Sequence, residues 1–80
     1  MKLVELTEFL VKNLVNDPES VSVRQIEDDD AINIEVLVSD DQIGAVIGRC
    51  GRTIEAIRTI VYASASICGN KRVRVNIDSV

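Results

Sequence analysis

The chain has 80 residues and a net charge of −4, with 46% hydrophobic and 28% charged residues, one proline, four glycines and no histidine. A chain this short buries only about 60% of the surface that it exposes when unfolded, so we expect one globular domain over residues 1–80. The composition excludes a long disordered region, and no apolar stretch approaches the roughly 20 residues that span a bilayer. Because the N-terminus does not resemble a signal peptide, the protein is expected to stay in the cytoplasm.

The first part of the chain predicts one helix and a β-hairpin. Apolar residues recur at helical spacing over residues 2–15, and Pro18 ends this helix. Residues 21–27 begin with the alternation of a strand, and the three aspartates at 28–30 form a polar turn. Residues 31–38 alternate strictly, so the short turn predicts an antiparallel pair of strands. The expected helical stripe consists of Leu3, Leu6, Leu10 and Leu14, and the second strand is expected to bury Ile32, Ile34, Val36 and Val38.

The second part predicts two helices and a last strand. Ser39 and Gln42 have the spacing of a capping box, which predicts a short helix over about 40–47. A longer helix is expected from about 52 to 68, ending at Gly69. Residues 71–78 alternate again and predict a strand. Gly44 falls inside the short helix, where close packing against a neighbouring element is its expected role.

The element order is therefore α-β-β-α-α-β. The last two strands are joined by a helical crossover, which is the connection that parallel strands need. We expect an α+β fold with two layers, in which three helices cover one face of a three-stranded mixed sheet. In the last strand Val73, Val75 and Ile77 should face the helices, and Arg72 and Arg74 should face outward.

Charge is distributed unevenly along the chain. Residues 1–42 carry three basic and eleven acidic residues, a net −8, whereas residues 43–80 carry six basic and two acidic residues, a net +4. This asymmetry predicts that a polyanion docks on the second half, although two ordinary solvated faces would explain the same numbers.

The glycine-rich turn between the last two helices is the candidate site. Gly48 and Gly51 allow a sugar–phosphate strand to approach the backbone, and the start of the next helix offers free N–H groups to phosphate. Arg49 and Arg52 add positive charge beside that path. Cys50 stands between them, either as a reactive thiol or as a small residue without a special role.

Residues 43–54 have the spacing I-G-x-x-I-G-x-x-G-x-x-I. With the element order, this spacing resembles the type II KH domain, a module that binds RNA and single-stranded DNA, with its GxxG loop at residues 48–51. The resemblance covers the whole chain, whose length and opening helix are similar to the small bacterial KhpA family. It implies an RNA chaperone that self-associates or pairs with a larger KH-containing partner of the KhpB type and takes part in cell elongation and division. Arg49 and Cys50 depart from the lysine and polar residue that are frequent in this family.

The bases are expected to lie in an aliphatic groove, because the chain has only two aromatic residues, Phe9 and Tyr62, for stacking. The groove is expected between the two helices and an edge of the sheet, and each apolar residue in it is alternatively an ordinary core residue. The predicted RNA-binding residues are Val46, Ile47, Gly48, Arg49, Cys50, Gly51, Arg52, Ile54 and Ile57.

The other basic residues have less specific interpretations. Lys71 is a further candidate for phosphate contact. Arg72 and Arg74 are expected to pair with Glu35 across the sheet rather than to bind RNA. Arg58 follows Glu55 by three residues and is expected to form an intrahelical pair.

Two other function classes remain to be weighed. An enzyme is not expected, because the chain has no histidine, no cluster of metal ligands and no cysteine beside a base; no cofactor or metal is predicted. The alternative is a KH-like protein-interaction or dimerisation module with little RNA affinity, for which Leu37 on the open sheet face would seed an interface. Cys50 and Cys68 should lie about 27 Å apart along a helix and are expected to be free thiols.

Overall fold

The computed structural model describes residues 2–67 and 72–80, and its element order is the predicted one. The helices and strands follow the spacing of apolar residues in the sequence. β2, α3 and β3 each bury one face, whereas β1 has no fully buried residue. They are α1 (Leu3–Lys12), the short 3₁₀ helix η1 (Pro18–Ser20), β1 (Ser22–Glu27), β2 (Ala31–Val38), α2 (Ile43–Ile47), the 3₁₀ turn η2 (Arg49–Gly51), α3 (Arg52–Ile67) and β3 (Arg72–Ser79).

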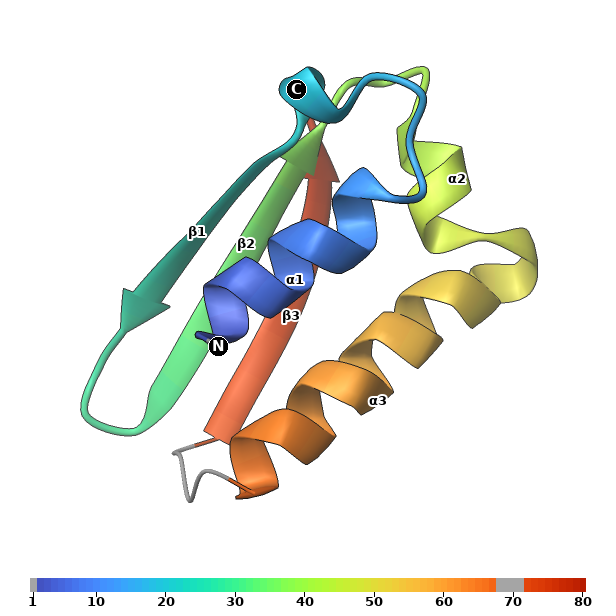
Figure 1. The fold of residues 1–80 in the computed structure, drawn as a ribbon. Coiled ribbons are helices and arrows are strands. Elements are labelled where there is room, and N and C mark those ends of the chain that lie inside the picture. The colour runs from blue at the N-terminus through green and yellow to red at the C-terminus, as the bar shows by residue number, and fades with distance from the viewer. Residues whose placement is uncertain (1, 68–71) are drawn as a thin grey trace.

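The three strands form one mixed sheet in the order β1-β2-β3, as predicted. β1 pairs antiparallel with β2, with Val23 opposite Val36, and β2 pairs parallel with β3, with Ile34 opposite Val75. Figure 1 shows α3 running back beside the sheet so that β3 lies next to the central strand. The α+β fold class is therefore confirmed.

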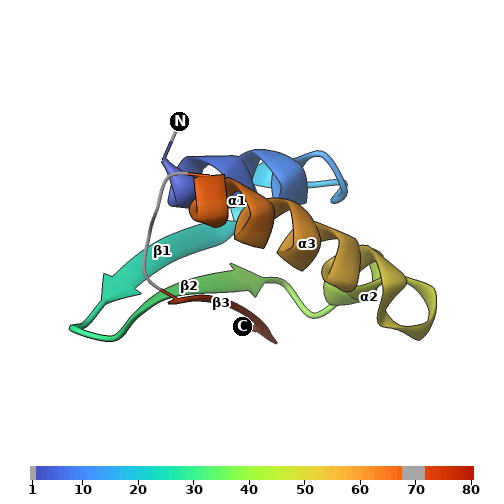
Figure 2. The ribbon, with the colours of Figure 1, turned by 90° about the horizontal axis from the view of Figure 1, so that it is seen from below.

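The helices lie on one side of the sheet and leave the other side open. Figure 2 shows α1 and α3 in a layer above the strands, with α2 at the end of the sheet where β2 leads out. The core lies between the two layers, and its apolar side chains in the described part of the chain are aliphatic; burying each of the larger ones contributes about 1.5–3 kcal/mol. Its fully buried members include Val11, Ile34, Val36, Val38, Val46, Val61 and Val75.

The buried face of α1 differs from the predicted leucine stripe. Leu3, Thr7 and Val11 face the core, whereas Leu6 and Leu10 pack only partly against it and Leu14 is exposed. Thr7 is tolerated in the core because its hydroxyl donates a 2.9 Å hydrogen bond to the carbonyl of Leu3, one turn earlier. The buried face of α1 is therefore displaced around the helix from the side that carries Leu6, Leu10 and Leu14.

The predicted capping box before α2 is wrong. The Gln42 side chain is buried, and its Oε1 accepts a 3.0 Å hydrogen bond from the backbone N–H of Asp17, 25 residues earlier. The Ser39 hydroxyl is buried without a hydrogen-bond partner among the described residues. Residues 39–42 form a turn, closed by the Gln42 N–H and the Ser39 carbonyl, and α2 begins only at Ile43.

In the described ranges, no helix has the length and apolar character needed to cross a bilayer.

Candidate functional site

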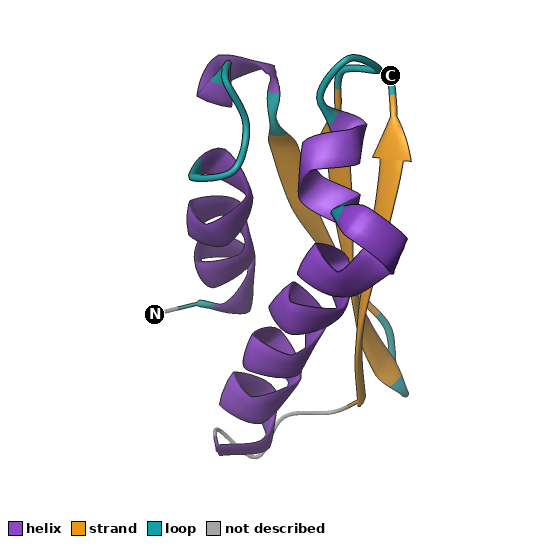
Figure 3. Ribbon diagram, turned by 90° about the vertical axis from the view of Figure 1, so that its right-hand side faces the viewer, coloured by secondary structure: helices purple, strands orange, loops and turns teal. Residues whose placement is uncertain are grey.

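The connection between α2 and α3 is a tight turn over residues 48–51, called the glycine turn below. Figure 3 shows it redirecting the chain from the short helix into the long one. Three of its four residues have positive φ: Gly48 at 77°, Cys50 at 56° and Gly51 at 74°. For Cys50 this left-handed conformation costs about 1 kcal/mol, so the turn keeps its shape against local strain.

The two glycines of this turn are required for different reasons. Gly48 combines φ 77° with ψ 173°, a region that is open essentially to glycine alone. A Cβ at Gly48 would in addition lie only 2.6 Å from Cβ of Thr53 and would collide with the Thr53 hydroxyl. At Gly51 nothing lies within 4 Å of an added Cβ, so only its φ of 74° favours glycine. The contact with Thr53 is a constraint that the GxxG pattern alone does not reveal.

The glycine turn presents backbone groups and positive charge to solvent. Arg49, Cys50 and Arg52 are exposed. Gly48 is the N-cap of the turn and has no side chain to accept hydrogen bonds from the following N–H groups. The only acidic residue in the first turn of α3 is Glu55, which is paired with Arg58. These features together make the turn a suitable place for an anion.

The predicted aliphatic residues lie beneath this turn rather than on its surface. Val46, Ile54 and Ile57 are buried in the main core, with at most 6% of each residue exposed. Ile47 packs against the same core but stays partly exposed. In this structure the three buried residues support the turn from below, and Ile47 is the one predicted aliphatic contact that reaches the surface.

Gly44 does not have its predicted packing role. It is exposed, and an added Cβ would have no heavy atom within 4 Å. The reason is that α2 turns Val46 toward the core, with Ile43 and Ile47 partly buried beside it, which leaves Gly44 on the outer surface. Its carbonyl accepts a 2.9 Å hydrogen bond from the N–H of Gly48, at the entrance to the glycine turn.

Arg58 forms the predicted pair with Glu55 and also makes a contact that was not predicted. Its Nη1 donates to Oε1 of Glu55 at 2.7 Å, while its Nε donates to the backbone carbonyl of Val75 at 3.1 Å. The side chain therefore spans from α3 to β3. Sequence spacing indicates the Glu55 pair, but the bond to Val75 depends on how the helix lies beside the last strand.

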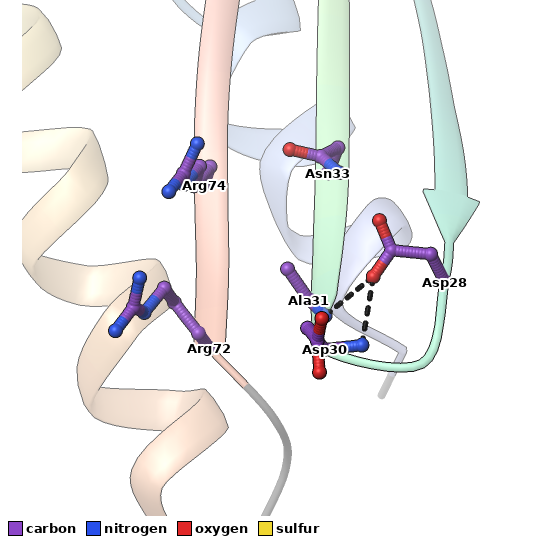
Figure 4. Close-up of a pocket in the computed structure, with 6 residues that line it drawn as sticks. All are labelled: Asp28, Asp30, Ala31, Asn33, Arg72 and Arg74. Carbon is purple, nitrogen blue, oxygen red and sulfur yellow. Dashed lines mark hydrogen bonds between the residues drawn. The ribbon is translucent and has the colours of Figure 1, made fainter.

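The expected pairing of Arg72 and Arg74 with Glu35 is wrong. Glu35 pairs instead with Arg24 on β1, at 3.0 Å, and stands opposite Asn76 rather than Arg74 in the parallel register. Figure 4 shows Arg72 and Arg74 on the open face of the sheet, directed away from the aspartates of the hairpin. With Ala31, Asn33, Asp28 and Asp30 they line a hollow of about 580 Å³. This hollow has both signs of charge, unlike the glycine turn.

A family model described as the KH domain of KhpA and KhpB matches residues 4–77. The chain belongs to this family. It is 45% identical over 73 residues to the RNA-binding protein KhpA of Clostridium perfringens, an alignment that covers 91% of this chain and 96% of that protein. The RNA-binding protein KhpA of Borreliella burgdorferi is 40% identical over 74 residues, covering 92% of this chain and 89% of the relative.

A similar fold occurs in a solved structure of a larger protein. The crystal structure of Era in complex with MgGDPNP and nucleotides 1506–1542 of 16S ribosomal RNA matches with a TM-score of 0.76 and 18% sequence identity. The match covers 98% of this chain but only 30% of the Era chain. At this identity the likeness concerns the fold alone.

The remaining predictions concern the two cysteines, residues 68–71 and the possibility of a bound metal ion. Cys50 is a free, exposed cysteine, while Cys68, the helix end at Gly69 and the candidate phosphate contact Lys71 fall in the range 68–71, which is not described. Over residues 2–67 and 72–80, no group of three or more acidic, cysteine or histidine side chains is placed to hold a metal ion.

Proposed function

We propose that this protein binds single-stranded RNA in the cytoplasm, acting as a single KH unit over its whole length. The observation that carries the proposal is the glycine turn, whose left-handed backbone presents Arg49 and Arg52 to solvent at the start of a 16-residue helix. The names of the KhpA relatives support RNA as the ligand. The finer roles implied by the family resemblance, as an RNA chaperone acting with a KhpB-type partner in cell elongation and division, belong to the same proposal.

In this proposal the backbone of the RNA lies on the glycine turn. A phosphate lies beside the start of α3 and is stabilised by the positive end of the helix dipole. Gly48 and Gly51 place no side chain between the strand and the backbone, and exposed Gly44 extends this bare surface. Arg49 and Arg52 supply charge, so affinity should fall as salt concentration rises.

The bases then follow the seam between α3 and the free edge of β3. Phe9 on α1 and Tyr62 on α3 are the only two aromatic residues and lie on separate helices, so they do not form a platform on which successive bases stack. Aliphatic contact with Ile47 and hydrogen bonds to the edge of β3 replace stacking. Without aromatic platforms we expect modest affinity and little discrimination of RNA from single-stranded DNA.

The test replaces both variable residues of the glycine turn by aspartate. We expect Arg49→Asp/Cys50→Asp to abolish binding to short single-stranded RNA in low-salt titrations, because it changes the local charge by −3 and repels phosphate. Asp tolerates the left-handed conformation of position 50, so the fold should survive. The matched control is Lys2→Asp/Gln25→Glu, which changes the charge equally at two exposed positions, one just before α1 and one on β1. A folded double aspartate variant with wild-type affinity would refute the proposal.

A second candidate function, self-association, is favoured by one specific observation. Ala56, Ile60, Ala63 and Ile67 are exposed and fall on one narrow stripe of α3, with Ile60 44% and Ile67 87% exposed. A two-fold axis midway between Ile60 and Ala63 would place each isoleucine against an alanine of the second copy. Large side chains would thus meet small ones along the whole stripe, as a self-complementary dimer contact requires.

Substitution on this stripe tests the second candidate. We expect Ile60→Asp to convert a dimer to a monomer in sedimentation analysis, because the introduced carboxylate would be buried against the second copy. Tyr62→Asp serves as the control, since Tyr62 is 40% exposed but lies on another side of α3. A wild-type protein that sediments as a monomer at high concentration would exclude this role and leave RNA binding unaffected.

A further inference from the structure

Arg58 is held by two partners at the seam between α3 and β3. Its Nε bonds to the Val75 carbonyl and its Nη1 to the Glu55 carboxylate, at 3.1 and 2.7 Å. The side chain of Arg58 is 30% exposed, whereas that of Glu55 is 67% exposed. The guanidinium is therefore fixed in one orientation, with part of it open to solvent.

The strand that Arg58 contacts has a free edge. Among the described residues β3 pairs only with β2, so its other side presents unpaired backbone groups. The Val75 carbonyl is one of these groups, and Arg58 occupies it. At the end of the strand, the N–H of Ser79 donates to Oδ1 of Asp78 at 2.8 Å, so a local side chain occupies that position too. The edge between these two positions remains open.

A count of donors shows what Arg58 has left to offer. A guanidinium carries five N–H donors in a planar fork and never loses its charge. Two of the five are used by Val75 and Glu55, which leaves three. Within the described part of the chain Glu55 is the only carboxylate in an ion pair with Arg58. The remaining donors thus have no acidic partner there.

The position of Arg58 relates these donors to the glycine turn. Arg58 is six residues beyond Arg52, about 9 Å further along the helix axis. A strand whose phosphates rest on the glycine turn and whose bases follow the α3–β3 seam passes over this guanidinium. Arg24, by contrast, makes a comparable 3.0 Å pair with Glu35 on the open face of the sheet, away from the helices.

The geometry points to Arg58 as an RNA-contacting residue that donates a pair of hydrogen bonds to two acceptors on one nucleotide. The inference rests on the proposed RNA binding. The acceptor pair has two sources with the same chemistry: the O6/N7 edge of guanine or two oxygens of a phosphate. Glu55 and the Val75 carbonyl act as positioning groups, since they orient the fork before RNA arrives and reduce the entropy lost on binding.

The experiment measures affinities for short oligouridines of equal length that carry one guanosine or one adenosine at each position in turn. Wild type, Arg58→Lys, Arg58→Gln and Glu55→Gln are compared by fluorescence anisotropy at several salt concentrations. Arg24→Lys and Arg24→Gln are matched controls, because they also remove one arginine paired with a glutamate. Thermal melts establish that each variant is folded.

The two sources give different results. If guanine is the acceptor, Arg58→Lys lowers the preference for guanosine over adenosine at one position by about tenfold, since lysine keeps the charge but loses the fork. If phosphate is the acceptor, Arg58→Gln weakens all oligonucleotides alike and reduces the salt dependence by about 0.7 in slope. In each case Glu55→Gln should change the same property, the preference for guanosine or the salt dependence, by a smaller factor.

Other outcomes overturn the inference. Arg58 variants that match the Arg24 controls in both base preference and salt slope would show that Arg58 has only a structural role. If that result accompanies loss of binding in Arg49→Asp/Cys50→Asp, RNA binding stands and the Arg58 inference alone fails. A wild-type protein that binds none of the oligonucleotides at low salt would overturn both.

Discussion

Two tight turns in this protein satisfy their backbone groups in opposite ways. The turn at residues 28–30, called the aspartate turn, joins β1 to β2, and the glycine turn joins α2 to α3. In the aspartate turn, Oδ1 of Asp28 accepts hydrogen bonds from the N–H groups of Asp30 and Ala31, at 2.8 and 2.7 Å (Figure 4). In the glycine turn the N-cap Gly48 has no side chain to accept any.

This difference separates a structural turn from the proposed binding surface. The aspartate turn uses its own carboxylate for its own backbone and surrounds it with negative charge, so it repels an incoming anion. In the glycine turn the N–H of Gly51 donates to the Gly48 carbonyl and the N–H of Arg52 to the Arg49 carbonyl, and the turn carries two exposed arginines. Both turns redirect the chain in a few residues, and only the glycine turn combines a backbone without side chains at two positions with exposed positive charge.

The largest expected effect comes from giving the glycine turn a side chain. Gly48→Ala should lower the free energy of unfolding by about 3 kcal/mol, because φ 77° with ψ 173° is unfavourable for alanine and the new methyl group collides with Thr53. Urea unfolding measures this change. Gly51→Ala is the control and should cost only about 1 kcal/mol, since its Cβ meets nothing. Equal costs would mean that the contact with Thr53 does not matter.

An intermediate effect is expected from the aspartate turn. Asp28→Ala removes the acceptor of two hydrogen bonds and should lower the free energy of unfolding by about 1.5 kcal/mol, while Asp28→Asn should retain part of it. RNA affinity should stay the same or rise slightly, as a negative charge is lost. A marked loss of RNA affinity in a folded Asp28→Ala variant would contradict the division of roles between the turns.

The smallest effect is expected at Cys50. Cys50→Asn should raise the free energy of unfolding by about 0.5 kcal/mol, because asparagine tolerates φ 56° better than cysteine does. The same urea titration measures it, with RNA affinity as a second readout. A destabilised Cys50→Asn variant would mean that the thiol makes a favourable contact that outweighs the strain.

Local patterns in the sequence were sufficient for most of the fold. The alternation over residues 31–38 predicted β2 with the bounds observed, because one buried face imposes a period of two. The GxxG spacing located the turn whose positive φ angles the structure shows. The helical crossover predicted the parallel pairing of β2 and β3. The strand and the turn follow from neighbours within a few residues, and the parallel pairing follows from the long helical connection between the two strands.

The predictions that failed depend on partners distant in the chain. Gln42 has the spacing of a capping residue, yet it bonds to the backbone of Asp17 because folding brings that segment alongside. The sequence offered Arg72 and Arg74 on β3 as partners for Glu35. In the folded sheet Glu35 stands opposite Asn76 on β3 and forms its ion pair with Arg24 on β1. The contacts of Gly48 with Thr53 and of Arg58 with Val75 likewise require the folded arrangement. The RNA contacts themselves stay predictions from the turn and its charges.

The parallel pairing of β2 and β3 also has a consequence for how the chain folds. β1 and β2 meet through contacts between residues 5 to 15 positions apart, such as Glu27 with Ile32 and Ser22 with Leu37. β3 joins the same central strand across 41 positions, as between Ala31 and Arg72. Contacts so distant in sequence form slowly, and during synthesis the hairpin is complete long before β3 leaves the ribosome. The rate of folding should therefore depend on how fast α3 delivers the last strand to an already formed hairpin.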